Sequence, residues 1–162
     1  MAELEETGAL LDGILAVTHP ELYNAGRKLM HRLYCEMGAA SRELVDAWPS
    51  VYHAVHIIVN RATVYHRDTN GLPGWYDMLV SVGDYGEEGV LSLKSLGASI
   101  PYDSGTVVLI CSRIISHGAP VVPPDRICYA WLMKEDVLAH YDAGEPGWST
   151  LSGVGVSESS SM

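Results

Sequence analysis

Hydrophobic residues recur with helical spacing in the first part of the chain, from residue 3 to about residue 47. One helix is predicted over residues 3–17. Its apolar positions are Leu4, Leu10, Leu11, Ile14 and Leu15. A second helix is predicted to begin at Pro20 and end near Gly38, because proline is favoured in the first turn and glycine just after the last.

After residue 48 the pattern changes to short apolar segments separated by turns. The segments are rich in β-branched residues, which is typical of strands, and Gly, Pro and Asp are frequent between them. The predicted strands are residues 51–59, 78–82, 90–93, 106–111 and 127–133. Helices followed by many short strands predict an α+β protein built on a β-sandwich or barrel.

The length of 162 residues suits one domain with its own hydrophobic core. We expect a single domain over residues 1–142, with helices over about 3–47 and a β core over about 50–137. Residues 143–162 are rich in Gly, Ser and acidic side chains, and we predict a disordered tail there.

The formal net charge is -10, which argues against a free-standing nucleic-acid-binding protein but is compatible with a local basic groove. Three cysteines without tight spacing predict neither a zinc site nor a disulfide framework. The acidic N-terminus does not resemble a signal peptide, and no apolar segment is long enough to span a bilayer. We therefore expect an intracellular monomer with no membrane partner.

The sequence His66-Arg67-Asp68 is the sharpest local signal for chemistry. Side chains two residues apart on a strand point to the same side, so this imidazole and carboxylate can reach one metal ion. A surface histidine beside an aspartate that caps the Asn70-Gly71 turn would give the same pattern.

Two later residues extend that signal. His117 follows an apolar segment and precedes a glycine, a context that taken alone favours a turn histidine. Arg126 precedes a buried strand and needs an anionic partner, for which Asp125 is one candidate. Two histidines and one carboxylate form the triad of non-haem Fe(II) oxygenases, and an arginine can bind the distal carboxylate of 2-oxoglutarate through two hydrogen bonds. The order of these residues therefore predicts an Fe(II) site with 2-oxoglutarate as co-substrate.

The sequence resembles the double-stranded β-helix 2-oxoglutarate/Fe(II) oxygenases and, within them, the fungal TET/JBP-like group. The resemblance covers residues 48–137 approximately. The matching segments are Asn60-Arg61, His66-Arg67-Asp68, Gly74-Trp75, Val82-Gly83-Asp84-Tyr85, Gly89-Val90-Leu91, Leu96-Gly97, Ile100-Pro101-Tyr102, Ser104-Gly105-Thr106-Val107-Val108, His117-Gly118 and Asp125-Arg126-Ile127-Cys128-Tyr129.

The resemblance implies a double-stranded β-helix core, of the jelly-roll or cupin type, with the N-terminal helices packed on it. It implies that His66, Asp68 and His117 hold Fe(II) and that Arg126 anchors 2-oxoglutarate. Asn60 matches an asparagine that lies shortly before the metal motif in this group, which implies a place in the substrate or co-substrate pocket, although a cap at a strand end would explain it equally well.

The same resemblance implies that the enzyme uses O2 and 2-oxoglutarate to hydroxylate the methyl group of 5-methylcytosine or thymine in DNA. Methylated DNA would then be the partner and the nucleus the location. An oxygenase acting on a protein side chain or small molecule is one alternative, which the acidic charge favours. A catalytically decayed β-helix domain is the other, and the complete set of site residues argues against it. A basic strip beside the metal site would favour DNA over the first alternative.

Overall fold

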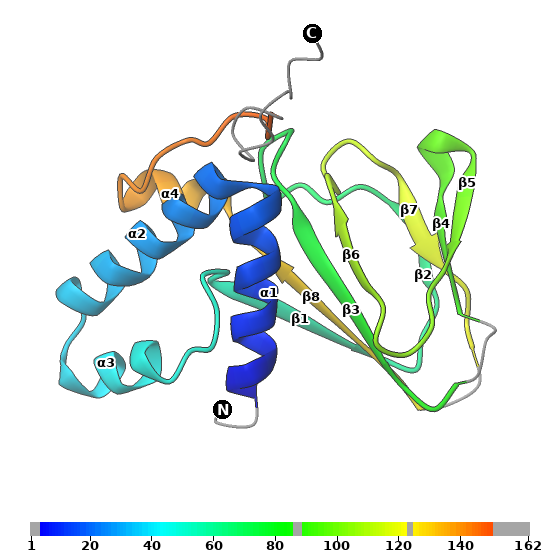
Figure 1. Cartoon of the computed structure of the whole chain (residues 1–162), viewed down its shortest axis with the longest axis horizontal. Coiled ribbons are helices and arrows are strands. Elements are labelled where there is room, and N and C mark those ends of the chain that lie inside the picture. Colours follow the sequence, from blue (N-terminus) through cyan, green and yellow to red (C-terminus); the bar gives the residue numbers. More distant parts are fainter. Residues whose placement is uncertain (1–3, 86–88, 123–124, 151–162) are drawn as a thin grey trace, which may run out of the picture. The chain divides into compact units, whose positions relative to one another are not determined.

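The computed structural model describes residues 4–85, 89–122 and 125–150 (Figure 1). The chain divides into a helical unit, Met1–His53 with Glu135–Met162, and a strand unit, Ala54–Lys134. Of the predicted disordered tail, residues 151–162 lie outside the described residues. Residues 143–150 form no helix or strand. Two of them form hydrogen bonds with residues near the N-terminus: His19 Nε2 lies 3.1 Å from the Gly147 carbonyl oxygen, and Ser149 Oγ donates to the Thr18 carbonyl oxygen.

The helical unit begins with α1 (Glu5–Thr18) and α2 (Pro20–Glu36), which confirms the two predicted helices. His19 separates them, and its Nδ1 accepts a hydrogen bond from the Leu22 backbone N–H and so caps α2. The described part of the unit also contains two short helices, α3 (Ala39–Asp46) and α4 (Glu135–His140). The apolar spacing did not distinguish α3 as a separate helix and did not predict α4. None of the helices in the described part of the chain has the length and apolar character needed to cross a bilayer.

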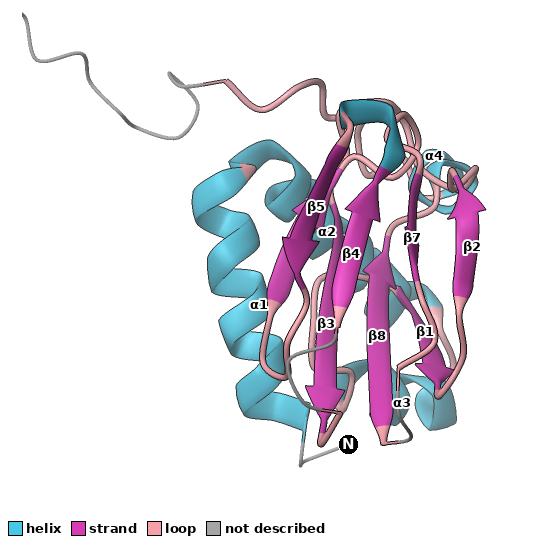
Figure 2. Cartoon of the chain, turned by 90° about the vertical axis from the view of Figure 1, so that its right-hand side faces the viewer, coloured by secondary structure: helices cyan, strands magenta, loops and turns pink. Residues whose placement is uncertain are grey.

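The described residues of the strand unit form eight strands in two antiparallel sheets of four, which confirms the α+β class. One sheet has the order β1-β8-β3-β6 and the other β2-β7-β4-β5, and Figure 2 shows them as two layers. The strands are β1 (Ala54–Val59), β2 (Thr63–His66), β3 (Asp77–Gly83), β4 (Val90–Leu93), β5 (Ala98–Pro101), β6 (Val107–Ile110), β7 (His117–Ala119) and β8 (Arg126–Leu132).

Five of these strands match the predicted segments, whereas β2, β5 and β7 were not predicted. Their sequences, Thr-Val-Tyr-His, Ala-Ser-Ile-Pro and His-Gly-Ala, contain polar residues, Gly or Pro, so no apolar run marks them as strands. The interior between the sheets contains apolar side chains from both layers. Its buried cluster is Leu79, Leu91, Tyr102, Ile110 and Cys128.

Glycine is required where β7 passes β2. A Cβ atom on Gly118 would lie 2.8 Å from the Thr63 carbonyl oxygen and 3.2 Å from the backbone nitrogen of Tyr65. The missing side chain lets the two short strands approach closely. This approach brings His66 opposite His117 in the register of the two strands.

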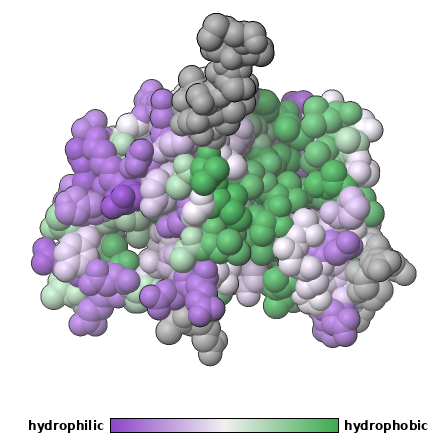
Figure 3. All heavy atoms as spheres, viewed as in Figure 1, coloured by the Kyte–Doolittle hydropathy of each residue, from purple (hydrophilic) through white to green (hydrophobic). Residues whose placement is uncertain are grey.

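The surfaces of the two units also differ in character. In the view of Figure 3, hydrophilic residues predominate over α2 and α3, whereas hydrophobic residues gather over β3 and β6. The polar surface of the helices agrees with their sequence, in which charged residues fill the positions between the apolar ones.

Candidate metal centre

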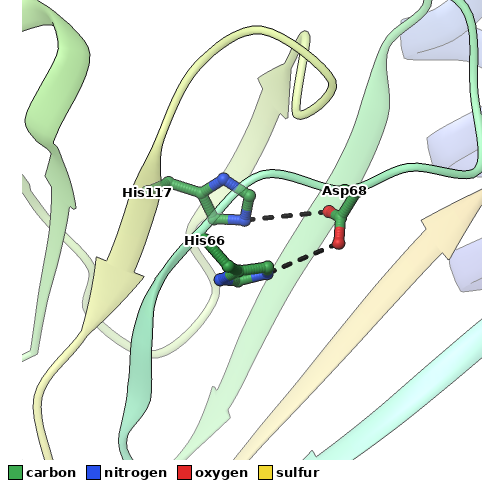
Figure 4. A group of neighbouring side chains, drawn as sticks. All are labelled: His66, Asp68 and His117. Carbon is green, nitrogen blue, oxygen red and sulfur yellow. Dashed lines mark ion pairs between the residues drawn. The ribbon is translucent and has the colours of Figure 1, made fainter.

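Three predicted site residues lie together at one end of the strand unit (Figure 4). His66 ends β2, Asp68 follows it by two residues, and His117 begins β7. One possible ligand atom from each of the three lies within 4.8 Å of the others, and no other such group of His, Cys, Asp or Glu is found among the described residues. Two adjacent strands and the segment that leaves one of them therefore bring the triad together.

Both imidazole rings point a nitrogen at the same carboxylate. His66 Nε2 lies 3.4 Å from Asp68 Oδ1, and His117 Nε2 lies 3.9 Å from Asp68 Oδ2. Two ligands with bonds of about 2.1 Å to one ion lie at most about 4.2 Å apart, so both distances are compatible with a shared ion. The rings are tilted by 52° with centroids 4.4 Å apart, so they approach the carboxylate from different directions.

The other ring nitrogens are held by the backbone. His66 Nδ1 lies 2.9 Å from the Val64 carbonyl oxygen, and His117 Nδ1 lies 3.0 Å from the Ile115 carbonyl oxygen. A carbonyl can only accept, so each Nδ1 carries the proton and each Nε2 presents a lone pair. Burial lowers the pKa of His117, which favours the neutral ring that a metal requires.

A cavity of about 600 Å³ lies beside the triad, between the two sheets. Its volume is within the range of small-molecule sites. Leu79, Leu91 and Ala130 are among its apolar lining residues, and Arg126 lies in the same cavity as the three triad residues.

Arg126 is the first residue of β8 and is only 2% exposed. Its Nη2 donates to the Arg61 carbonyl oxygen at 2.8 Å, but its Nε and Nη1 have no hydrogen-bond partner among the described residues. No described carboxylate, Asp125 included, lies within 4.0 Å of the guanidinium, so the salt bridge considered from sequence is not formed. Leaving a buried charge unpaired is strongly unfavourable, and a carboxylate in the cavity would satisfy both free donors.

Asn60 contributes to the site through the backbone of Arg126. Its Oδ1 accepts from the backbone N–H groups of Asp125 and Arg126 at 2.9 and 2.8 Å, and its own N–H donates to the Arg126 carbonyl. Asn60 has a φ of 47°, a conformation that asparagine tolerates better than most residues. These contacts fit the strand-end cap, and Asn60 does not line the cavity. A contact with substrate stays a prediction.

Sequence reasoning missed Asp77, a buried carboxyl group that lines the same cavity. Its Oδ2 accepts a hydrogen bond from the Ser112 hydroxyl. Burial raises the pKa of Asp77 to about 7, opposed by the Ser112 hydrogen bond and reinforced by the charge of Asp68. The available signal was its place directly before an apolar strand, the same position that drew attention to Arg126.

The donor set fits Fe(II) and 2-oxoglutarate. Two neutral imidazoles and one carboxylate are the ligands of non-haem Fe(II) oxygenases. The two free donors of Arg126 suit the distal carboxylate of the co-substrate, and the cavity joins both groups.

The chain has a distant similarity to a solved TET structure. A solved structure of NgTET1 in complex with 5mC DNA, one of twelve solved chains that match, is 12% identical with a TM-score of 0.49. The match covers 76% of this chain and 47% of that chain, so the protein spans about half the length of this relative. No curated protein sequence matches the chain.

The model of the Tet_JBP family, described as the oxygenase domain of the 2OGFeDO superfamily, matches residues 1–135. This match includes the N-terminal helices as well as the whole strand unit. Members of this superfamily use Fe(II) and 2-oxoglutarate, for which the site has fitting residues. The chain therefore belongs to the Tet_JBP family of oxygenase domains within the 2-oxoglutarate/Fe(II)-dependent dioxygenases.

Proposed function

We propose that this oxygenase binds one Fe(II) ion through His66, Asp68 and His117 and hydroxylates the methyl group of 5-methylcytosine or thymine in DNA. The observation that carries the proposal is the placement of the triad and of a buried arginine with two free donors in one cavity. Family membership supports the reaction class, and the surface around the triad supports the substrate.

The strand pairing supports a double-stranded β-helix. β1 pairs with β8, β2 with β7, β3 with β6 and β4 with β5, all antiparallel. Such nested pairing arises when one long hairpin is wound into two layers, as in jelly rolls. In this fold the space between the layers is the natural place for a metal and a small co-substrate.

Each site residue would have a distinct task. Fe(II), when bound, would activate O2 as the oxidant, so that one oxygen atom hydroxylates the methyl C–H bond while the other converts 2-oxoglutarate to succinate and carbon dioxide. The backbone carbonyls behind His66 and His117 hold the proton of each neutral ring on Nδ1 and leave Nε2 aimed at the ion. Arg126 orients 2-oxoglutarate by its far carboxylate, and the apolar walls of the cavity exclude water.

Basic side chains around the triad support a nucleic-acid substrate. Arg67, Lys94 and Arg113 are all exposed, and none of them pairs with a carboxylate among the described residues. Lys94 Nζ lies 5.0 Å from the ring centroid of Tyr65 on β2, and Arg113 Nη1 donates to the Thr69 carbonyl oxygen, one residue after Asp68. Cations in this position suit the phosphates of DNA.

The opposite end of the strand unit is acidic. Its acidic residues are Asp84, Asp103 and Asp125. The hydrogen bonds of Asp84 N–H to the Asp125 carbonyl and of Gly83 N–H to Ser104 Oγ place these turns together, where β3 ends and β8 begins. Exposed cations therefore lie near the triad, whereas Asp84, Asp103 and Asp125 lie at the other end of the strand unit, close to Arg61.

An oxygenase that acts on a protein side chain or small molecule is the second candidate. The net charge of -10 favours it, because a polyanion is repelled by an acidic protein at long range. A decayed domain is disfavoured by the retention of all three possible ligands together with Arg126.

The experiment incubates the protein with duplex DNA containing 5-methylcytosine, Fe(II), 2-oxoglutarate and ascorbate, and analyses the nucleosides by mass spectrometry. Asp68→Ala is the matched control. We expect hydroxymethylcytosine with the wild type alone. Succinate formation without an oxidised base, on either 5-methylcytosine or unmodified thymine-containing DNA, would shift the assignment to the second candidate. Absence of succinate under all conditions would contradict the oxygenase activity itself.

A further inference from the structure

The loop of residues 111–116, between β6 and β7, supports two of the three triad residues through its backbone. The carbonyl oxygen of Ser112 accepts from the Asp68 backbone N–H at 3.1 Å. The carbonyl oxygen of Ile115 accepts from His117 Nδ1 at 3.0 Å. The position of this loop therefore determines where the Asp68 carboxylate and the His117 ring lie.

A buried side-chain pair fastens the start of this loop to β3. Ser112 is 2% exposed, and its hydroxyl donates to Oδ2 of Asp77, which is 8% exposed. Asp77 is the first residue of β3 and lies directly opposite Ile110 of β6. Ser112 follows Ile110 by two residues in the chain. Ser112 thus uses its hydroxyl to hold Asp77 and its carbonyl to hold Asp68.

The chemistry of the pair is unusual for a purely structural contact. A buried carboxyl group is unfavourable unless it is hydrogen-bonded, and an apolar pair would fill the same space without that penalty. Polar partners behind metal ligands orient those ligands and commonly change metal affinity by 10–100-fold when removed. Asp77 and Ser112 have the placement of such partners, one hydrogen bond behind Asp68.

Strand β3, which begins with Asp77, also contains a buried serine that has no hydrogen-bonded link to the triad among the described residues. Ser81 is fully buried, and its hydroxyl lies 2.7 Å from the Tyr85 hydroxyl, which donates to the Tyr102 carbonyl. No hydrogen bond of this group reaches a triad residue. Ser81 is therefore a matched reference for the loss of one buried hydroxyl.

We propose that Asp77 and Ser112 are positioning residues that set the place of Asp68 and, through the loop of residues 111–116, of His117. The proposal rests on the proposed metal site. It assigns to the pair no contact with the ion.

The test measures the affinity for Mn(II), a redox-inert substitute for Fe(II), by calorimetry and electron paramagnetic resonance, together with the melting temperature of the metal-free protein. Ser112→Ala should weaken Mn(II) binding by about 10-fold or more, and Ser112→Thr, which keeps the hydroxyl, should restore it. Ser81→Ala should lower the melting temperature but leave Mn(II) affinity unchanged. Asp68→Ala should abolish specific binding.

Asp77 gives a second, independent pair of variants. Asp77→Ala removes the acceptor and should weaken Mn(II) binding as much as Ser112→Ala, and the two losses should not add in the double variant. Asp77→Asn keeps an acceptor oxygen and should lose less affinity than Asp77→Ala. The comparison of Asp77→Ala with Asp77→Asn does not depend on whether Ser112→Ala folds well.

The outcomes separate the two levels of the argument. Wild-type affinity in Ser112→Ala and Asp77→Ala, with binding lost in Asp68→Ala, would overturn the positioning role and leave the metal site standing. Equal losses in Ser81→Ala and Ser112→Ala would also overturn it, because the effect would then be general destabilisation. Equal binding by wild type and Asp68→Ala would overturn the metal site and the positioning role together.

Discussion

The helical unit and the strand unit differ sharply in charge. The helical unit contains thirteen acidic and four basic residues, a formal charge of -9, whereas the strand unit contains seven acidic and six basic residues, a formal charge of -1. Nearly all of the net charge of -10 therefore belongs to the unit that lacks the candidate site. Whole-chain charge was the wrong scale for judging a nucleic-acid substrate, because phosphates meet a local surface.

The largest expected effect compares a buried histidine from each unit. His117→Ala removes a proposed ligand and should abolish Mn(II) binding and 2-oxoglutarate turnover. His19→Ala removes the cap of α2, at a cost of about 1 kcal/mol in the free energy of unfolding, and should leave turnover per folded molecule unchanged. Succinate assays with melting curves measure both. Retained turnover in His117→Ala would contradict its role as a metal ligand.

A second prediction compares two arginines. Arg126→Gln should raise the KM for 2-oxoglutarate by about 30-fold or more, because truncating one partner of a buried charged pair costs about 2–5 kcal/mol. The KM of Arg126→Lys should lie between those of the wild type and Arg126→Gln, since lysine keeps the charge without the planar pair of donors. Arg32→Gln removes a half-exposed ion pair with Asp142 in the helical unit, and the KM should not change. An unchanged KM in Arg126→Gln would refute its role as the anchor.

A third prediction sharpens the charge comparison with two triple variants of equal net charge. One changes Arg67, Lys94 and Arg113 to Gln in the strand unit. The other changes Arg27, Lys28 and Arg42 to Gln in the helical unit. If the strand-unit cations contact phosphates, the strand-unit variant should bind duplex DNA with a weaker salt dependence. The slope of log affinity against log salt concentration should decrease in magnitude by about 2.7, since each phosphate contact contributes about 0.9. The second should leave that slope unchanged, as fluorescence anisotropy would measure. Equal effects would mean that only overall charge matters.

A fourth prediction is a pH dependence of stability in the metal-free protein. The pKa of Asp77 is raised by burial from 3.8 to about 7, so the folded state holds a proton that the unfolded state has released between these pH values. The free energy of unfolding should therefore fall as pH rises from about 4 to about 7. Asp77→Asn should remove this part of the decline in urea titrations. An identical pH profile in the variant would contradict the assignment.

The fold was predictable where a periodic pattern was long. The two long helices and the five strands with apolar segments follow from the sequence pattern, and the α+β class follows from their order. The start of the strand unit is also close to the change of pattern after residue 48, but no local signal marks the assignment of the segment from Glu135 onward to the helical unit. β7 was missed since its three residues, His117–Ala119, read locally as a turn.

The site was predictable in part because its residues are chemically conspicuous. His66, Asp68, His117 and Arg126 were identified from residue type and order, and the structure places them around one cavity. Asp77 and Ser112 were not identified. Their relation to Asp68 depends on the pairing of β3 with β6 and on one backbone hydrogen bond, neither of which has a local sequence signature.

The central claim is that the metal and 2-oxoglutarate share one cavity in the strand unit, with the triad and Arg126 as their separate holders. Calorimetric titration of 2-oxoglutarate into the protein, with and without Mn(II), tests this most directly. We predict binding that requires Mn(II), disappears in Asp68→Ala and is strongly weakened in Arg126→Gln. Equal binding of 2-oxoglutarate with and without the metal, or to Asp68→Ala and the wild type, would contradict the claim.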